Sequence, residues 1–115
     1  MIAVVWQFDV KDGKHDEFEA FYGANGAWTK LSRRSRSFLG SSFLRDLAQP
    51  DRYVVLEYWS EMVVYERHRK SFVTDIRSIE HRRDELCDAI LPLGIFSALD
   101  VPDREGPTWS RRDGR

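Results

Sequence analysis

The opening strand constrains the fold more than any other segment, because it is apolar on both faces. Alternate residues within 2–10 place large apolar side chains on one face: Ile2, Val4, Trp6, Phe8 and Val10. The intervening positions Ala3 and Val5 carry apolar side chains to the other face. An alternation of this kind predicts a β-strand, and its two apolar faces predict a strand that is covered on both sides.

The segment after this strand predicts a helix that begins near Lys14 and is soon interrupted. Its apolar residues fall at i, i+3 and i+4, the spacing of one helical face: Phe18, Phe21 and Tyr22. Two glycines within residues 22–26 disfavour a continuous helix, so we expect a short second helical piece around Trp28. The arginine-rich run 33–36 is interpreted as a solvated helix end.

The second half of the chain predicts a hairpin, a long helix and a last short strand. Residues 37–46 and 52–60 have strand character and are joined by the turn-forming residues 48–51. Ser60 is the expected N-cap of an amphipathic helix that extends to Leu86, either continuous or divided near residues 73–74. Residues 95–99 follow as the final short strand.

The predicted order of elements is β-α-β-β-α-β, which is the ferredoxin-like arrangement of the α+β class. Its antiparallel sheet carries the helices on one face. The other face is also rich in apolar side chains, and an exposed apolar surface of that size is an association surface. We therefore expect a homodimer that buries sheet against sheet.

Composition and charge exclude several classes of function. A formal net charge of −1, from 18 basic and 19 acidic residues, disfavours nucleic-acid binding. The apolar start lacks the features of a signal peptide and no run of about 18 apolar residues follows, so we expect a cytoplasmic protein that does not enter the membrane. Cys87, the single cysteine, is expected to be a small buried residue, and the three scattered histidines predict no metal site.

The chain divides into a domain at residues 1–99 and a charged C-terminal tail at residues 100–115. The tail mixes arginines and acids around Trp109. We expect this tail to be flexible, unless Trp109 anchors it to a partner subunit.

Four segments together resemble the antibiotic biosynthesis monooxygenase (ABM) domain family over about residues 2–99. They are Tyr22–Trp28, Phe38–Asp46, Arg52–Ser60 and Tyr65–His68. The resemblance implies a dimeric α/β barrel with a pocket between sheet and helices in each subunit. Characterised members include cofactor-free oxygenases of polycyclic phenols, quinol-type oxygenases and haem-degrading enzymes. Haem chemistry is disfavoured here, because Trp6 stands near the position of the asparagine that haem-degrading members use.

Oxygenation without a cofactor needs a base, a group that holds an anion and a dry aromatic cavity. We expect a small aromatic substrate to contact five aromatic residues: Trp59, Trp6, Phe8, Tyr65 and Trp28. The alternative is that these aromatics only fill the core. The candidate catalytic residues are His68, Glu57 and Arg69.

Glu57 and His68 are the two candidate bases. Glu57 interrupts an apolar strand, and a buried carboxylate either shifts its pKa upward or pairs with a cation, for example Arg45 on the neighbouring strand. His68 titrates near neutral pH and lies three residues after Tyr65, with Arg69 beside it as a group that stabilises an anion. A solvated boundary position is the alternative for His68.

Three functions follow from these residues. The first is a cofactor-independent monooxygenase of a small aromatic or polyketide-like molecule, and the second is a non-catalytic or ligand-binding dimer. Haem binding or degradation is the third. A cavity of about 300 Å³ with convergent polar groups favours the enzyme, whereas an interior filled by Trp6, Trp28 and Trp59 favours the second function.

Overall fold

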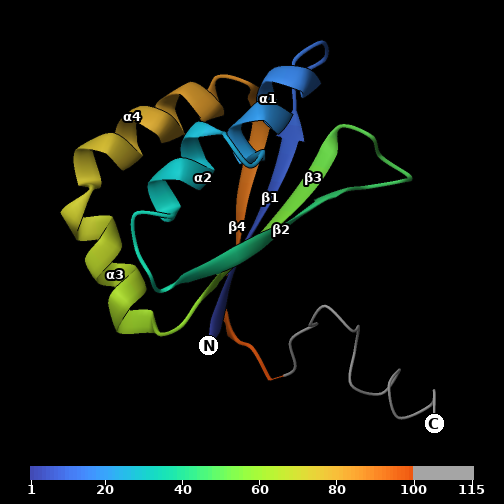
Figure 1. The fold of residues 1–115 in the computed structure, drawn as a ribbon. Helices are drawn as coiled ribbons and strands as arrows, with labels where there is room; N and C mark the ends of the chain where they lie inside the picture. Colours follow the sequence, from blue (N-terminus) through green and yellow to red (C-terminus); the bar gives the residue numbers. More distant parts are fainter. Residues whose placement is uncertain (100–115) are drawn as a thin grey trace, which may run out of the picture.

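The opening strand, which is apolar on both faces, is one of the two central strands of a four-stranded antiparallel sheet. The computed structural model describes residues 1–99, and its sheet has the order β2-β3-β1-β4. The strands are β1 (Ile2–Val10), β2 (Phe38–Arg45), β3 (Arg52–Trp59) and β4 (Cys87–Ser97). Figure 1 shows the helices gathered on one face of this sheet. The order and the antiparallel pairing confirm the predicted ferredoxin-like α+β fold.

The pairing of β1 with β3 determines which side chains face the helices. Phe8 lies opposite Tyr53, and Val4 lies opposite Glu57. Because side chains alternate along a strand, Glu57 and Trp59 share the helix-covered face with Tyr53. All three side chains are buried, so the helices cover this face along the whole of β3.

Helices α1 (His15–Tyr22) and α2 (Ala27–Ser32) are separate, as the two glycines predict. Gly26 packs so closely on the end of α1 that a Cβ atom there would overlap the backbone of Ala20 and Phe21. This close approach brings Trp28, two residues later, into the core.

The long amphipathic segment forms two helices, α3 (Met62–Ser71) and α4 (Val73–Asp84), which confirms the divided alternative. They meet at Phe72, whose φ of −117° and ψ of 30° lie outside the helical region. The predicted N-cap at Ser60 is wrong. Its backbone N–H donates to the carbonyl of Ser37, which extends the β-ladder, and Glu61 precedes the first turn instead.

The last strand was predicted too short, because Pro92 and Gly94 indicated a loop. In the structure β4 begins at Cys87 and pairs with β1 through both residues. Proline is tolerated because β4 is an edge strand, where a missing N–H costs no ladder bond on the outer side. Gly94 adopts a φ of +136° near a register shift in the pairing with β1.

The sheet face away from the helices carries exposed apolar side chains. Leu44, Leu91 and Phe96 are each about half exposed, at 53%, 51% and 50%. The homodimer predicted from the apolar character of this face stays a prediction. No helix within residues 1–99 has both the length and the apolar character to cross a membrane. The predictions for residues 100–115, the flexible tail and the role of Trp109, concern residues outside the described range.

Candidate functional site

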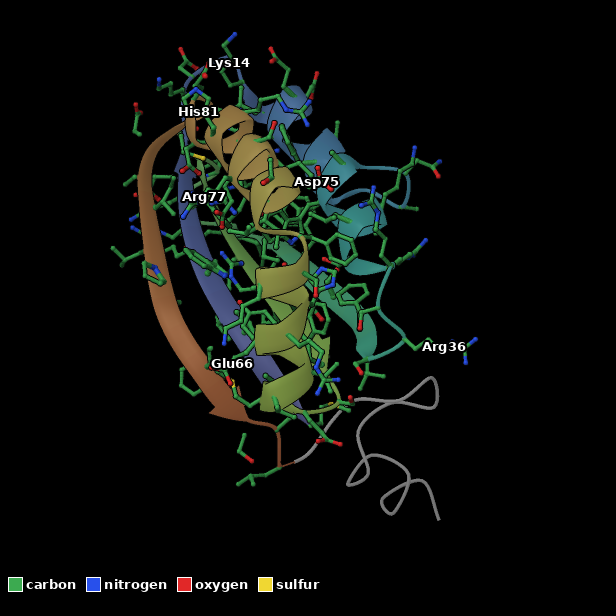
Figure 2. All side chains as sticks on the ribbon, turned by 90° about the vertical axis from the view of Figure 1, so that its left-hand side faces the viewer. Lys14, Arg36, Glu66, Asp75, Arg77 and His81 are labelled. Carbon is green, nitrogen blue, oxygen red and sulfur yellow. The ribbon has the colours of Figure 1, made fainter. Side chains whose placement is uncertain are left out.

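A small cavity lies between β3 and three of the helices, on the helix-covered face of the sheet. Its volume is about 10 Å³, which is room for about one water molecule. The residues that line it come from α2, β3, α3 and α4: Trp28, Leu31, Ser32, Glu57, Trp59, Tyr65, His68, Arg69 and Ile76. Six of the eight predicted site residues therefore meet at one place, although their segments are far apart in the sequence. Figure 2 shows how densely side chains occupy the space between the sheet and α3 and α4.

Glu57 is the buried acid at the base of this cavity, with 3% of its surface exposed. Its two carboxylate oxygens accept hydrogen bonds from two indole N–H groups. Trp28 donates to Oε2, and Trp59 donates to Oε1 at 3.4 Å. Burial raises the pKa of Glu57 above its usual value, and the two indole donors oppose this rise by stabilising the ionised form.

The predicted salt bridge between Glu57 and Arg45 is wrong. In the β2–β3 pairing Ser41 lies opposite Glu57, and Arg45 lies opposite Tyr53 at the other end of the strand. Arg45 instead approaches the Glu19 carboxylate at 3.6 Å. The hairpin register, which the sequence did not define, therefore separates the two predicted partners.

Trp59 forms the aromatic wall of the cavity and is almost fully buried. Its ring centroid lies 5.3 Å from that of Phe38 and 5.3 Å from that of Tyr65. The imidazole of His68 is closer still, at 4.9 Å. These contacts hold the indole between the sheet edge and α3, and an aromatic ligand in the cavity would pack against it.

His68 is buried, not solvated, and 7% of its surface is exposed. Its ring lies between those of Trp59 and Phe72, and its Nδ1 atom is buried without a hydrogen-bond partner in the described part of the chain. Burial lowers the pKa of His68, with a further contribution from the positive charge of Arg69. The imidazole is therefore neutral at neutral pH and has a ring nitrogen that is free to accept a proton.

Arg69 lines the rim of the cavity. Its guanidinium donates to Glu80 at 3.1 Å and lies 6.0 Å from the centre of the Tyr65 ring. The ion pair ties α3 to α4. An anion in the cavity would compete with Glu80 for this guanidinium.

Trp6 and Phe8 lie on the same sheet face but do not line the cavity. They belong to a neighbouring cluster around Arg83, a buried cation that the sequence interpretation missed. The Arg83 guanidinium lies 5.5 Å from the ring of Trp6, 4.9 Å from that of Phe8 and 5.3 Å from that of Trp28. Trp28 thus contacts the Arg83 cation through its ring face and the Glu57 carboxylate through its N–H group.

A signal for Arg83 was present in the sequence. Ile76, Ile79, Arg83 and Leu86 follow one another in steps of three and four, which places Arg83 on the apolar face of α4. Its position within a charged run concealed this periodicity. Cys87, which follows it by one turn, is buried as predicted, and burial raises the pKa of its thiol to about 11.

The site therefore combines a neutral imidazole, an aromatic wall and a guanidinium at the rim. These groups can accept a proton from a phenolic ligand, stack against its ring and stabilise the anion that forms. The cavity is too small for such a ligand as it stands. Its volume is far below the 300 Å³ or so of a small-molecule site, and the large indoles of Trp28 and Trp59 are among the residues that line it.

Solved structures from several organisms share this fold. A cofactor-independent oxygenase from Streptomyces nogalater, SnoaB, is 19% identical with a TM-score of 0.63, and the match covers 87% of this chain and 94% of that chain. A conserved protein from Methanosarcina mazei Go1 is 21% identical with a TM-score of 0.61, over 83% and 89% of the two chains. The protein Rv0793 from Mycobacterium tuberculosis is 16% identical with a TM-score of 0.65, over 89% and 98%. At these identities the likeness shows the fold alone.

No curated protein matches this chain in sequence. A family model does match, over residues 1–82, and its description is antibiotic biosynthesis monooxygenase. This range contains every residue that lines the cavity and more than half of the 115 residues. The chain belongs to the antibiotic biosynthesis monooxygenase family.

Proposed function

We propose that this protein is a cofactor-independent oxygenase that acts on a small phenolic aromatic molecule. The observation that supports this most strongly is the buried Nδ1 of His68, which has no hydrogen-bond partner within residues 1–99 and belongs to a residue that lines an aromatic cavity. A buried polar atom without a partner is costly, and functional sites are where such atoms are retained. The name of the similar structure from Streptomyces nogalater, a cofactor-independent oxygenase, agrees with this proposal.

His68 is the base in the proposed reaction. Both oxygens of Glu57 already accept indole N–H groups, so Glu57 orients Trp28 and Trp59, whereas His68 has a free nitrogen. His68 removes a proton from a phenol or from an adjacent ring CH₂ group, and Arg69 stabilises the resulting anion.

The electrons come from the substrate. The carbanion reduces O₂, a carbon–oxygen bond forms, and loss of water from the resulting hydroperoxide leaves a carbonyl. The overall change is R₂CH₂ + O₂ → R₂C=O + H₂O, in which the carbon loses four electrons and O₂ gains four.

Substrate entry requires α2 and α3 to move apart, because the closed cavity holds about 10 Å³. The two elements that would separate are joined to the rest of the chain by non-helical residues. Gly23 and Gly26 precede α2, and Phe72 ends α3. These junctions are where rigid helices can change direction.

Oxygen consumption with a panel of naphthols and anthrones tests the proposal. We expect uptake of one O₂ per quinone formed, and a loss of about 100-fold in rate in His68→Gln, the usual contribution of a general base. His81→Gln is the matched control, because His81 lies on the exposed surface of α4 and should keep the full rate. Turnover that is equal in wild type and His68→Gln would refute the role of His68.

A second candidate is a ligand-binding or non-catalytic dimer, which the small cavity volume favours. This function predicts that none of the aromatic compounds consumes O₂ above the rate without protein. The haem alternative is tested by addition of haemin, where the absence of a Soret shift would remove it.

We also propose that the open face of the sheet is the interface of a homodimer. Leu44, Leu91 and Phe96 lie on this face and are about half exposed, and a second copy of the same apolar face would cover them. Sedimentation at micromolar concentration should give twice the monomer mass of 13.5 kDa. A mass of one monomer would contradict the dimer.

A further inference from the structure

A groove between α2 and α4 lies directly outside the cavity. Its volume is about 300 Å³, which is within the range of small-molecule sites. Figure 1 shows the two helices side by side. The groove has an apolar floor, formed by Ala27, Leu31 and Ile79, and a polar margin.

The margin of the groove is positively charged. Lys30 and Arg34 come from α2 and the turn after it, Arg82 comes from α4, and Asp75 is the single acid among the lining residues. Asp75 pairs with Arg34 at 3.1 Å. Within residues 1–99 no carboxylate forms an ion pair with Lys30 or Arg82. Arg82 does lie over the Phe21 ring, at 5.8 Å from its centre, so the groove presents two cations that an anion can approach without displacing an internal carboxylate.

The arginines that follow α2 differ in what they contact. Arg34 lines the groove, and its guanidinium also lies 5.2 Å from the centre of the Phe72 ring. Arg36 points away from the rest of the molecule in Figure 2. Both side chains are exposed, with Arg34 at 54%, so the interpretation of this run as a solvated helix end is confirmed for Arg34 and for Arg36.

The groove and the cavity share one wall. Leu31 lines both spaces, so its side chain separates the charged margin outside from the aromatic interior around His68. Lys30, the residue before it, lies on the groove side. A ligand with an anionic end and an aromatic end would match the two spaces in this order.

We propose that the α2–α4 groove binds the carboxylate of an aromatic acid, with Lys30 and Arg82 as the residues that recognise it. The carboxylate lies against these cations, and the ring lies over Leu31 and enters the cavity when α2 moves. This inference rests on the proposed function, because it names the class of substrate, an aryl carboxylic acid, that the His68 site would receive.

Binding of naphthoate and of its neutral analogue naphthalenemethanol tests the inference without any turnover. Titration of the full chain is followed by calorimetry and by the fluorescence of the indoles near the groove. Naphthoate should bind about tenfold more tightly than the alcohol. Each of the two exposed ion pairs should strengthen binding about threefold, and the two factors multiply. Higher salt should reduce this preference.

Two single variants and a matched control locate the binding. Lys30→Gln and Arg82→Gln should each weaken naphthoate binding about threefold and leave naphthalenemethanol binding unchanged. Arg77→Gln is the control, because it also removes one positive charge from an exposed position on α4. Figure 2 shows Arg77 on the opposite side of α4 from Asp75, which lines the groove. This control should bind naphthoate as the wild type does.

The outcomes separate this inference from the proposed function. If the protein binds naphthoate no more tightly than the alcohol, or if Arg77→Gln weakens naphthoate binding as much as Arg82→Gln does, the groove is not a carboxylate site. If the variants behave as expected but no aromatic compound consumes O₂, the groove inference is supported and the oxygenase proposal fails. If neutral phenols are oxidised as fast as their carboxylated analogues, the oxygenase proposal stands and the groove inference fails.

Discussion

The hydrogen bond from Trp28 to Glu57 can be measured by comparison of two tryptophan substitutions. Trp28→Phe removes the indole N–H that donates to the buried carboxylate. Trp6→Phe makes the same chemical change in a second ring near Arg83. The Arg83 guanidinium lies 5.5 Å from the centre of the Trp6 ring and 5.3 Å from that of Trp28. The structure gives no hydrogen bond from the Trp6 indole within residues 1–99. Trp28 is buried and Trp6 only partly, so the part of the difference between the two variants that changes with pH reports the bond to Glu57.

The size of this difference follows from the burial of Glu57. A hydrogen bond to a charged group contributes about 1.5 to 3 kcal/mol, and Glu57 is 3% exposed, so bulk water does not reach the carboxylate to replace the lost donor. Trp28→Phe should therefore lower the free energy of unfolding by about 1.5 to 3 kcal/mol more than Trp6→Phe does. For a domain of this size each kcal/mol corresponds to roughly 4 to 8 °C in Tm.

The difference should also depend on pH. Burial raises the pKa of Glu57 above 4.5, and the Trp28 N–H opposes this rise because it stabilises the ionised carboxylate. The stabilisation by Trp28 is therefore complete above the folded-state pKa and is lost as the pH falls through it. The gap between the two variants should be larger at about pH 8 than at about pH 4.5.

Urea unfolding of both variants, followed by circular dichroism at the two pH values, measures these free energies. A Trp28→Phe variant that is no less stable than Trp6→Phe at the higher pH would contradict a stabilising bond from Trp28 to Glu57. A gap that is the same at both pH values would also contradict it, because the bond would then not depend on the charge of Glu57.

Three further predictions concern the pH response and the packing. Because burial lowers the pKa of His68, its imidazole should titrate below 6.5 in NMR spectra, and a midpoint above 6.5 would contradict this. For the same reason the wild type should lose stability relative to His68→Gln as the pH falls from about 7 to about 5. Gly26→Ala should lower the free energy of unfolding in urea by at least about 1 to 3 kcal/mol, since its Cβ would overlap backbone atoms. Gly23→Ala, where the nearest atoms lie 3.8 Å from the added Cβ, should change this free energy by less than about 1 kcal/mol. Equal losses would contradict the close packing of α2. Phe8→Ala should cost about 3 to 5 kcal/mol because Phe8 is fully buried, and fully exposed Leu47 should tolerate alanine within about 0.5 kcal/mol in the same assay; a small loss at Phe8 would place it outside the core.

Local sequence patterns were sufficient for most of the fold. The alternation in residues 2–10 predicted β1 to the residue, and the glycines after Tyr22 predicted the division between α1 and α2. The last strand was predicted wrongly because Pro92 and Gly94 punctuate it. Their effect depends on whether a strand lies at the edge of its sheet, and that follows from the tertiary structure, not from the strand's own sequence.

The candidate site was predicted less completely, for reasons of register and distance. The sequence indicated Glu57, Trp59 and His68 as site residues, and the structure brings all three to one cavity. One of the two alternatives for Glu57 paired it with Arg45, because the register of the hairpin was unknown, whereas the other, an upward shift of its pKa, agrees with its burial. The partner that Glu57 has instead, Trp28, lies 29 residues earlier in the chain, and only the packing of α2 on the sheet brings the two together.

The most direct test of the account is whether an aromatic ligand reaches His68. The imidazole signals of isotope-labelled histidine are followed by NMR while naphthol is added, and the His68 signal is assigned by its loss in His68→Gln. The His68 signal should shift saturably while the signal of exposed His81 stays in place. A His68 signal that remains unchanged at saturating naphthol would contradict the assignment of this cavity as the functional site.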